Sequence, residues 1–315
     1  MTSSKRRLGG ALGAAFAAVG VFGAVASSAA SANPATTPPA GLTVPADTSA
    51  APVVLVASLE GRNEVTAGAP VGQALEVIGI HDNTLTYSIS WRGIGTPIEA
   101  DIHAGPRGVD GPVVVPLFGT PRPPDGFVSG TVTVTDPTVL AALRSDPGSF
   151  YTDLHTDQFP DGAVRAQFHL LNHAVTTTGV AVLQESVIFG SQIYACTQRS
   201  DGSFAFTQHD VDARLDGGIH HTFVQPDAGP PQWQAPDGTA VSGKVATRND
   251  NGEGNIAELN LDATQIGKST GLLGDVVEVL RLNTVGGVAP AGVCDPQATP
   301  TVNVPYQADY VFING

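Results

Sequence analysis

Positive charge is scarce in this sequence. Only 15 of its 315 residues are Lys or Arg, against 29 Asp or Glu, and three of the basic residues lie within the first seven positions. Beyond residue 32 the chain carries 12 basic and 29 acidic side chains, which is a net charge of −17. A surface this acidic repels phosphate backbones, so we expect no nucleic-acid partner. It favours a protein that stays dissolved, or one that attracts cations.

Cysteine is scarcer still, since only Cys196 and Cys294 are present. Two thiolates alone cannot build a four-ligand zinc or iron–sulfur site. In an oxidising compartment the simplest interpretation of an even pair is one disulfide. The alternative is two separate buried thiols. A Cys196–Cys294 bridge would close a loop of about 100 residues, and the chain-entropy argument gives it about 4–5 kcal/mol.

Familiar enzyme signatures are also missing. The sequence has no Gly-x-Ser-x-Gly elbow and no His-Glu-x-x-His motif. Gly267-Lys268-Ser269 is similar to the end of a phosphate-binding loop, but Asp262 stands where that loop requires its first glycine. These absences predict a non-catalytic protein.

The N-terminus has the pattern of a secretory signal. Basic residues at 5–7 precede a run of small apolar residues from Leu8 to Ala26, and Ala30-Ser31-Ala32 fits a cleavage site. We therefore predict a signal peptide at residues 1–32 and a protein that is secreted, extracellular or in the cell envelope. An uncleaved membrane anchor is the alternative. No second apolar run is long enough to span a bilayer, so we expect no membrane span after cleavage.

The length and composition of the remaining 283 residues predict a linker and two domains. Residues 33–52 are rich in Ala, Pro, Thr and Ser, which predicts a flexible linker. Short β-rich runs separated by turn residues follow, without a sustained 3.6-residue period. This predicts an all-β protein with two antiparallel β-sandwich or barrel domains in tandem, at 53–171 and 180–315, joined by a linker at 172–179. The first has one short helix that begins after Asp136.

Two predicted strands of the first domain carry an acid and an imidazole on the same face. Side chains alternate along a strand, so Asp101 and His103 point one way on the first, and Asp153 and His155 do so on the second. If the strands are neighbours, these four residues converge. Mixed nitrogen and oxygen ligands suit zinc, copper or iron, and the carboxylates alone suit calcium.

The alternative for these side chains is an ordinary solvated sheet face. Arg165 lies just downstream and could form a structural ion pair with Asp153 or with Asp161. Such a pair would account for the acids without a metal. His209, Asp210 and Asp212 form a further polar patch with the same alternative.

Several motifs of the first domain occur in a familiar order over about 110 residues, and together they resemble the CHRD domain, which is named for chordin and also found in bacterial secreted proteins. They are Leu59-Glu60-Gly61-Arg62-Asn63-Glu64-Val65, Ile102-His103-Ala104-Gly105-Pro106-Arg107-Gly108, Leu154-His155-Thr156 and Phe159-Pro160-Asp161-Gly162-Ala163-Val164-Arg165-Ala166-Gln167. The resemblance implies an immunoglobulin-like or superoxide-dismutase-like β-sandwich and no established catalytic activity. Asp101 stands where the family has the first histidine of His-Ile-His, which removes one imidazole from the candidate site.

The second domain resembles DUF3455, a family of unknown function found in secreted microbial proteins. The motifs are Gln192-Ile193-Tyr194-Ala195-Cys196, Trp233-Gln234-Ala235-Pro236-Asp237-Gly238-Thr239, Arg281-Leu282-Asn283-Thr284-Val285-Gly286-Gly287 and Cys294-Asp295. Both cysteines belong to the family pattern, so the resemblance favours a Cys196–Cys294 bridge. It implies no function.

These observations predict a secreted or envelope-associated binding or structural protein that is not an enzyme. Its partner would be an extracellular protein, a glycan or another surface ligand, and no cofactor is firmly implied. The alternative is an extracellular β-domain that binds a divalent metal, with or without redox chemistry, through Asp101, His103, Asp153 and His155.

Overall fold

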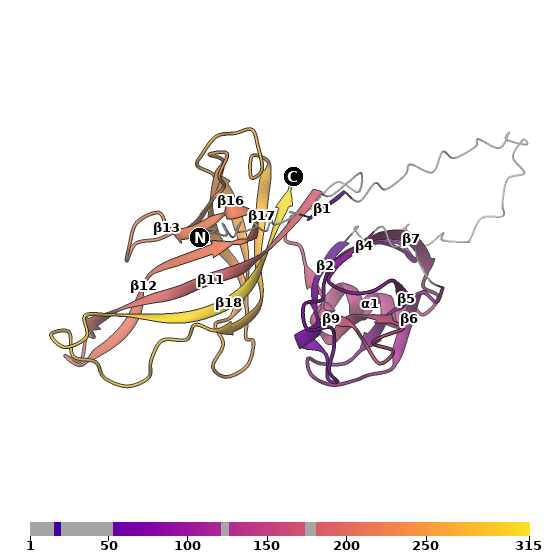
Figure 1. Ribbon diagram of the computed structural model, residues 1–315, viewed down its shortest axis with the longest axis horizontal. Coiled ribbons are helices and arrows are strands. Elements are labelled where there is room, and N and C mark those ends of the chain that lie inside the picture. The colour runs from indigo at the N-terminus through magenta and orange to yellow at the C-terminus, as the bar shows by residue number, and fades with distance from the viewer. Residues whose placement is uncertain (1–15, 20–52, 121–125, 174–180) are drawn as a thin grey trace, which may run out of the picture. The chain divides into compact units, whose positions relative to one another are not determined.

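The computed structural model describes residues 16–19, 53–120, 126–173 and 181–315 (Figure 1). The chain forms two compact units, which divide between Ala181 and Val182. Of the predicted signal peptide only β1 (Phe16–Val19) is described, a strand next to β11 in its sheet. The predicted linker at 33–52 and most of the one at 172–179 lie outside the described residues. No helix in the described ranges is long and apolar enough to cross a membrane.

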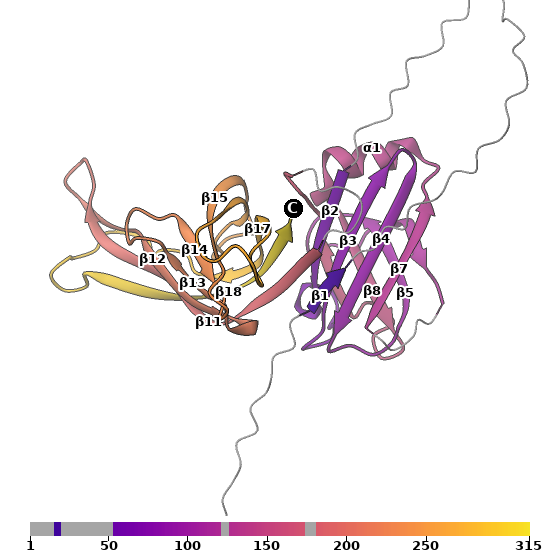
Figure 2. The ribbon, with the colours of Figure 1, turned by 90° about the horizontal axis from the view of Figure 1, so that it is seen from above.

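The N-terminal unit is one antiparallel sheet folded over a core, with strand order β6-β5-β8-β9-β2-β3-β4-β7 and β10 paired to β2. Figure 2 shows β2, β3, β4 and β7 side by side in one layer, with β5 and β8 in the layer behind. The strands are β2 (Val53–Glu60), β3 (Gln73–His81), β4 (Thr84–Arg92), β5 (Pro97–Ala104), β6 (Val113–Phe118), β7 (Phe127–Thr133), β8 (Phe150–Thr156), β9 (Val164–Gln167) and β10 (His169–Leu170).

Period-two alternation builds the core of this unit. Leu55, Ala57 and Leu59 of β2 and Leu154 of β8 are fully buried between the layers. Burial of such side chains contributes about 1.5–3 kcal/mol each. Two single-turn 3₁₀ helices lie in the connections: η1 (Gly61–Asn63) follows β2, and η2 (Pro147–Ser149) directly precedes β8.

The short helix was predicted correctly. It is α1 (Pro137–Ser145), and its Asp136 cap accepts a hydrogen bond from the Thr138 N–H at 2.8 Å. Pro137 occupies the first turn, where its missing N–H costs nothing. Leu140 and Leu143 turn into the core.

The C-terminal unit is an antiparallel sheet in which each strand pairs with the next and β18 pairs back with β11, so the sheet closes on itself. Trp233, Tyr310 and Phe312 are buried inside it. The all-β tandem prediction is thus confirmed. The strands are β11 (Ala181–Gln198), β12 (Phe204–Leu215), β13 (His220–Phe223), β14 (Pro231–Gln234), β15 (Ala240–Asn249), β16 (Glu258–Gln265), β17 (Val276–Gly286) and β18 (Thr301–Asn314), with the 3₁₀ turn η3 (Asp216–Gly218).

The predicted disulfide between Cys196 and Cys294 is confirmed. It joins the end of β11 to the segment before β18, 98 residues away in sequence. Backbone hydrogen bonds flank it: the Cys196 N–H donates to Pro300 O at 2.8 Å, and the Cys294 N–H donates to Phe204 O at 3.2 Å. The bridge therefore belongs entirely to the C-terminal unit.

Reduction of this disulfide should lower the melting temperature of the C-terminal unit alone. Loss of a bridge over a loop this long costs about 4–5 kcal/mol on the chain-entropy model. Calorimetry with and without dithiothreitol, and of a Cys196→Ser/Cys294→Ser variant, measures the two transitions. Equal shifts of both transitions would contradict the assignment of the bridge to one independent unit.

Candidate metal centre

The candidate site lies on the outer face of β5 and β8, which are neighbouring antiparallel strands. Asp101 pairs with Asp153, His103 with Tyr151, and Glu99 with His155. Directly opposed residues of an antiparallel pair project from the same face. The intervening residues, such as Ile102, point into the core. The condition set by the sequence, that the two strands be neighbours, is therefore met.

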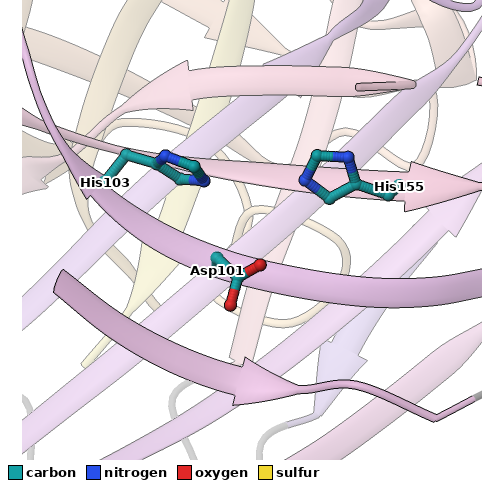
Figure 3. Close-up of side chains that lie close together, drawn as sticks. All are labelled: Asp101, His103 and His155. Atoms are coloured by element: carbon teal, nitrogen blue, oxygen red, sulfur yellow. The ribbon is translucent and has the colours of Figure 1, made fainter. Parts of the chain in front are cut away.

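Three of the four predicted residues converge. One ligand atom each from Asp101, His103 and His155 lies within 4.8 Å of the others. Figure 3 shows the two imidazole rings turned toward one another, with the Asp101 carboxylate beside the gap between them. Asp101 is 4% exposed and both histidines are half-buried. Burial, and secondarily the charge of Glu99, raises the pKa of Asp101.

Backbone carbonyls determine which ring nitrogens are available. His103 Nδ1 lies 2.9 Å from Gly111 O, and His155 Nδ1 lies 3.0 Å from Pro160 O. A carbonyl oxygen only accepts, so each Nδ1 carries the proton and each Nε2 keeps its lone pair. Metal-binding histidines are oriented in this way. His103 Nε2 is buried without a hydrogen-bond partner, as expected of an atom that awaits a ligand.

The fourth predicted residue, Asp153, lies beside this group and outside it. Its Oδ1 is 4.0 Å from His155 Nε2 and has no hydrogen-bond partner. Burial, and then the nearby Glu64 carboxyl, raises the pKa of Asp153 to about 8. Burial also raises the pKa of Glu64 to about 7. Gly162 leaves room for both carboxyls, because a Cβ there would lie 2.6 Å from Glu64 Oε2 and 2.8 Å from Asp153 Oδ1.

Glu64 was not predicted as a site residue. It lies in a loop outside any strand, so alternation could not place it. The signal in the sequence that could have indicated Glu64 was its position in the Leu59–Val65 motif.

The predicted ion pair of Arg165 with Asp153 needs correction. The guanidinium is buried and donates through Nη1 to Asp110 Oδ1 at 2.9 Å. Its Nη2 donates to Val109 O at 2.6 Å and to Pro106 O at 3.3 Å. Arg165 is opposite Asp153 in the register of β8 and β9, but the planar guanidinium reaches the three acceptors of the loop after β5 instead. Its charge still lowers the pKa of Asp153.

Tyr151 holds His103 in place. The two rings stack with centroids 4.8 Å apart and 12° between their planes. The Tyr151 hydroxyl accepts a hydrogen bond from the Gly111 N–H at 3.0 Å. Arg165 covers Tyr151, with its guanidinium carbon 3.4 Å from the ring centroid. Tyr151 lies two residues before Asp153 on β8 and so shares its face, but nothing in the sequence indicated its role.

The donor set is chemically suited to a transition metal. Two imidazole nitrogens and a carboxylate oxygen match zinc, copper or iron, whereas calcium prefers oxygen ligands alone. Bonds of about 2.0–2.2 Å at tetrahedral angles place two ligand atoms about 3.3–3.6 Å apart. The three atoms, which lie within 4.8 Å of one another, therefore need to close by up to about 1.5 Å to bind one ion.

Polar clusters of the C-terminal unit do not form a comparable group. His209 Nδ1 pairs with Asp227 at 2.7 Å, and His220 Nε2 pairs with Asp212 at 2.8 Å. Asp210 instead accepts from the backbone N–H of Phe223. In the part of the chain that the structure describes, the Asp101 group is the only set of three or more such side chains that gathers.

The fold and this face thus define a tandem all-β protein with a candidate metal centre in its N-terminal unit. Residues 55–168 match the CHRD domain family. Residues 217–314 match a protein family of unknown function, DUF3455. Both resemblances drawn from the motifs are confirmed, and every residue of the candidate centre lies in the CHRD domain. No curated protein and no solved structure matches the chain.

Proposed function

We propose that this chain is a secreted or envelope-associated binding protein whose CHRD domain holds a divalent transition-metal ion through Asp101, His103 and His155. The observation that carries the proposal is the orientation of the two imidazoles. Each commits Nδ1 to a backbone carbonyl and directs Nε2 toward a buried carboxylate. The metal hypothesis, an alternative on sequence grounds, is the one that the geometry supports best.

Export is supported by separate features. A disulfide persists in an oxidising compartment, and the chain has one. The basic and apolar pattern of residues 1–32 supports a signal peptide, and the net charge of −17 beyond it favours cations over phosphate polymers. The missing enzyme motifs support a binding or structural role. An extracellular protein, a glycan or another surface ligand remains the class of partner that we propose.

Metal analysis of protein purified without an affinity tag tests the proposal. We expect one equivalent of zinc or copper by mass spectrometry, and calorimetric binding of zinc but not of calcium after treatment with a chelator. His155→Ala should lower zinc affinity at least about 100-fold, since it removes a ligand outright. Asp101→Asn should also weaken binding, and Asp153→Asn should do so less.

The matched control is His209→Ala, which removes a half-buried histidine of the C-terminal unit that already pairs with Asp227. Its zinc binding should equal that of the parent protein. Protein that binds no transition metal would refute the proposal. Equal losses of zinc affinity in His209→Ala and His155→Ala would show that zinc does not bind specifically at the Asp101, His103 and His155 site.

A further inference from the structure

We infer that metal binding holds the loop from Gly105 to Gly111 (the 105–111 loop) in one conformation, so that the ion controls the surface that this loop presents. The inference rests on the proposed metal site.

The 105–111 loop is fastened at its tip by one side chain. Arg165 holds Pro106 O, Val109 O and the Asp110 carboxylate. Within the tip, the Val109 N–H donates to Pro106 O at 3.3 Å and closes a turn. Gly108 has φ +73°, a conformation that glycine adopts without strain.

The ends of the loop are fastened by other groups. Gln167 Nε2 donates to Gly105 O at 2.9 Å, and the Gly105 N–H donates to Ser149 O at 2.9 Å. At the other end both backbone groups of Gly111 bond to the stacked side chains of Tyr151 and His103. The N–H donates to the Tyr151 hydroxyl, and the carbonyl accepts from His103 Nδ1. Gly111 cannot be replaced without a shift, because a Cβ there would lie 1.8 Å from Ala104 O.

The bond from His103 to Gly111 is the link between metal and loop. A metal ion on Nε2 requires the proton to be on Nδ1, and it makes that N–H a stronger donor. Without a metal, the neutral ring can carry its proton on Nε2 instead. Nδ1 is then an acceptor that faces the Gly111 carbonyl, another acceptor, so the bond is lost. A bound ion excludes that tautomer, so it strengthens the hydrogen bond that His103 already makes to the loop.

The segment under this control is on the surface. Arg107 and Gly108 are exposed, Val109 is 50% exposed, and the Asp110 side chain is 64% exposed. These residues place a cation, an apolar side chain and an anion on one short turn. A contact made by this turn would therefore depend on the ion.

Trypsin measures the locking directly, because Arg107–Gly108 is a cleavage site at the loop tip. Cleavage of a folded protein follows the population of the locally opened state. We expect zinc chloride to slow cleavage at Arg107 about tenfold relative to the chelator-treated protein, the effect of strengthening one hydrogen bond. Fragment masses identify the bond that is cut. Cleavage after Arg199, in the turn between β11 and β12 of the C-terminal unit, is the internal control and should not change.

Two variants separate the link from the site. His155→Ala removes a metal ligand but leaves both partners of the His103–Gly111 hydrogen bond in place. Trypsin should therefore cut after Arg107 at the fast rate with or without zinc. His103→Asn places an amide N–H near the position of Nδ1 and offers no Nε2, so cleavage should be slow and independent of zinc. Zinc binding with an unchanged rate at Arg107 would overturn the inference and leave the metal site standing. Absence of zinc binding in the calorimeter would overturn both.

Discussion

Replacement of Glu76 by Gln should stabilise the N-terminal unit in alkaline solution by about 5 kcal/mol more than it does near pH 4. Glu76 lies on β3 with 0% exposure, on the face that also carries Ala74 and Ile78 of the core. Neither of its carboxyl oxygens has a hydrogen-bond partner. Burial raises its pKa from 4.5 to about 8, and the nearby Thr152 hydroxyl offsets only part of this.

The direction of the pH dependence follows from which state binds the proton. Below about pH 4.5 the carboxyl is protonated in both states and contributes no slope. Between about 4.5 and 8 the unfolded chain loses the proton while the folded chain keeps it. Stability therefore falls as pH rises, by about 1.4 kcal/mol per pH unit, and levels off above pH 8. The amide of the Glu76→Gln variant does not titrate, so that contribution to the slope disappears.

Urea unfolding of both proteins from pH 4 to pH 9, with a chelator present, measures how the free energy of unfolding changes with pH in each. The raised pKa values of Glu64 and Asp153 affect both proteins and cancel in the comparison. Asp157→Asn, at an exposed position directly after β8, is the control and should leave the slope unaltered. Parallel curves for Glu76→Gln and the parent would show that Glu76 is ionised in the folded protein.

The alternation of side chains predicted more of the candidate site than of its surroundings. From sequence alone it placed Asp101 with His103, and Asp153 with His155, on common faces. Whether β5 and β8 were neighbours depended on pairing across about 50 residues and an intervening helix, which local pattern does not specify. The same signal was available for Glu76, since alternation along β3 puts it on the same face as the apolar Ala74 and Ile78.

The contacts that orient the site could not be predicted. Gly111 O and Pro160 O fix the two imidazoles, and every residue has a carbonyl, so sequence does not distinguish them. The sequence suggested Asp153 or Asp161 as the partner of Arg165 because both are close to it in the chain, whereas Asp110 is 55 positions away. The closure of the C-terminal sheet could not be predicted either. The sequence did not decide between a sandwich and a barrel, because the deciding contact pairs β11 with β18, the strands at the two ends of the domain.

Arg165→Met should destabilise the N-terminal unit by about 3 kcal/mol and also weaken zinc binding. Hydrogen bonds from a charged group contribute about 1.5–3 kcal/mol each, and Arg165 makes three to the 105–111 loop. The acceptors are near the surface, where water replaces part of that loss, so the full sum is not expected. The cation–π contact with Tyr151 adds about 1 kcal/mol.

The effect on zinc follows because Arg165 supports the positions of Tyr151 and Gly111, and these hold His103. We expect zinc affinity to fall about 10-fold or more, the range for groups that orient a ligand. Arg165→Lys should recover little of either loss, since an ammonium cannot bond Asp110 and two carbonyls in one plane or stack on Tyr151. Arg62→Met removes a more exposed arginine that pairs with Glu60, and should cost about 0–1 kcal/mol with zinc affinity intact. Urea unfolding and zinc calorimetry on the three variants measure the two effects. An Arg165→Lys protein with the stability and zinc affinity of the parent would contradict this account. It would mean that the positive charge alone, acting on Asp153 and Glu64, explains why an arginine is buried here.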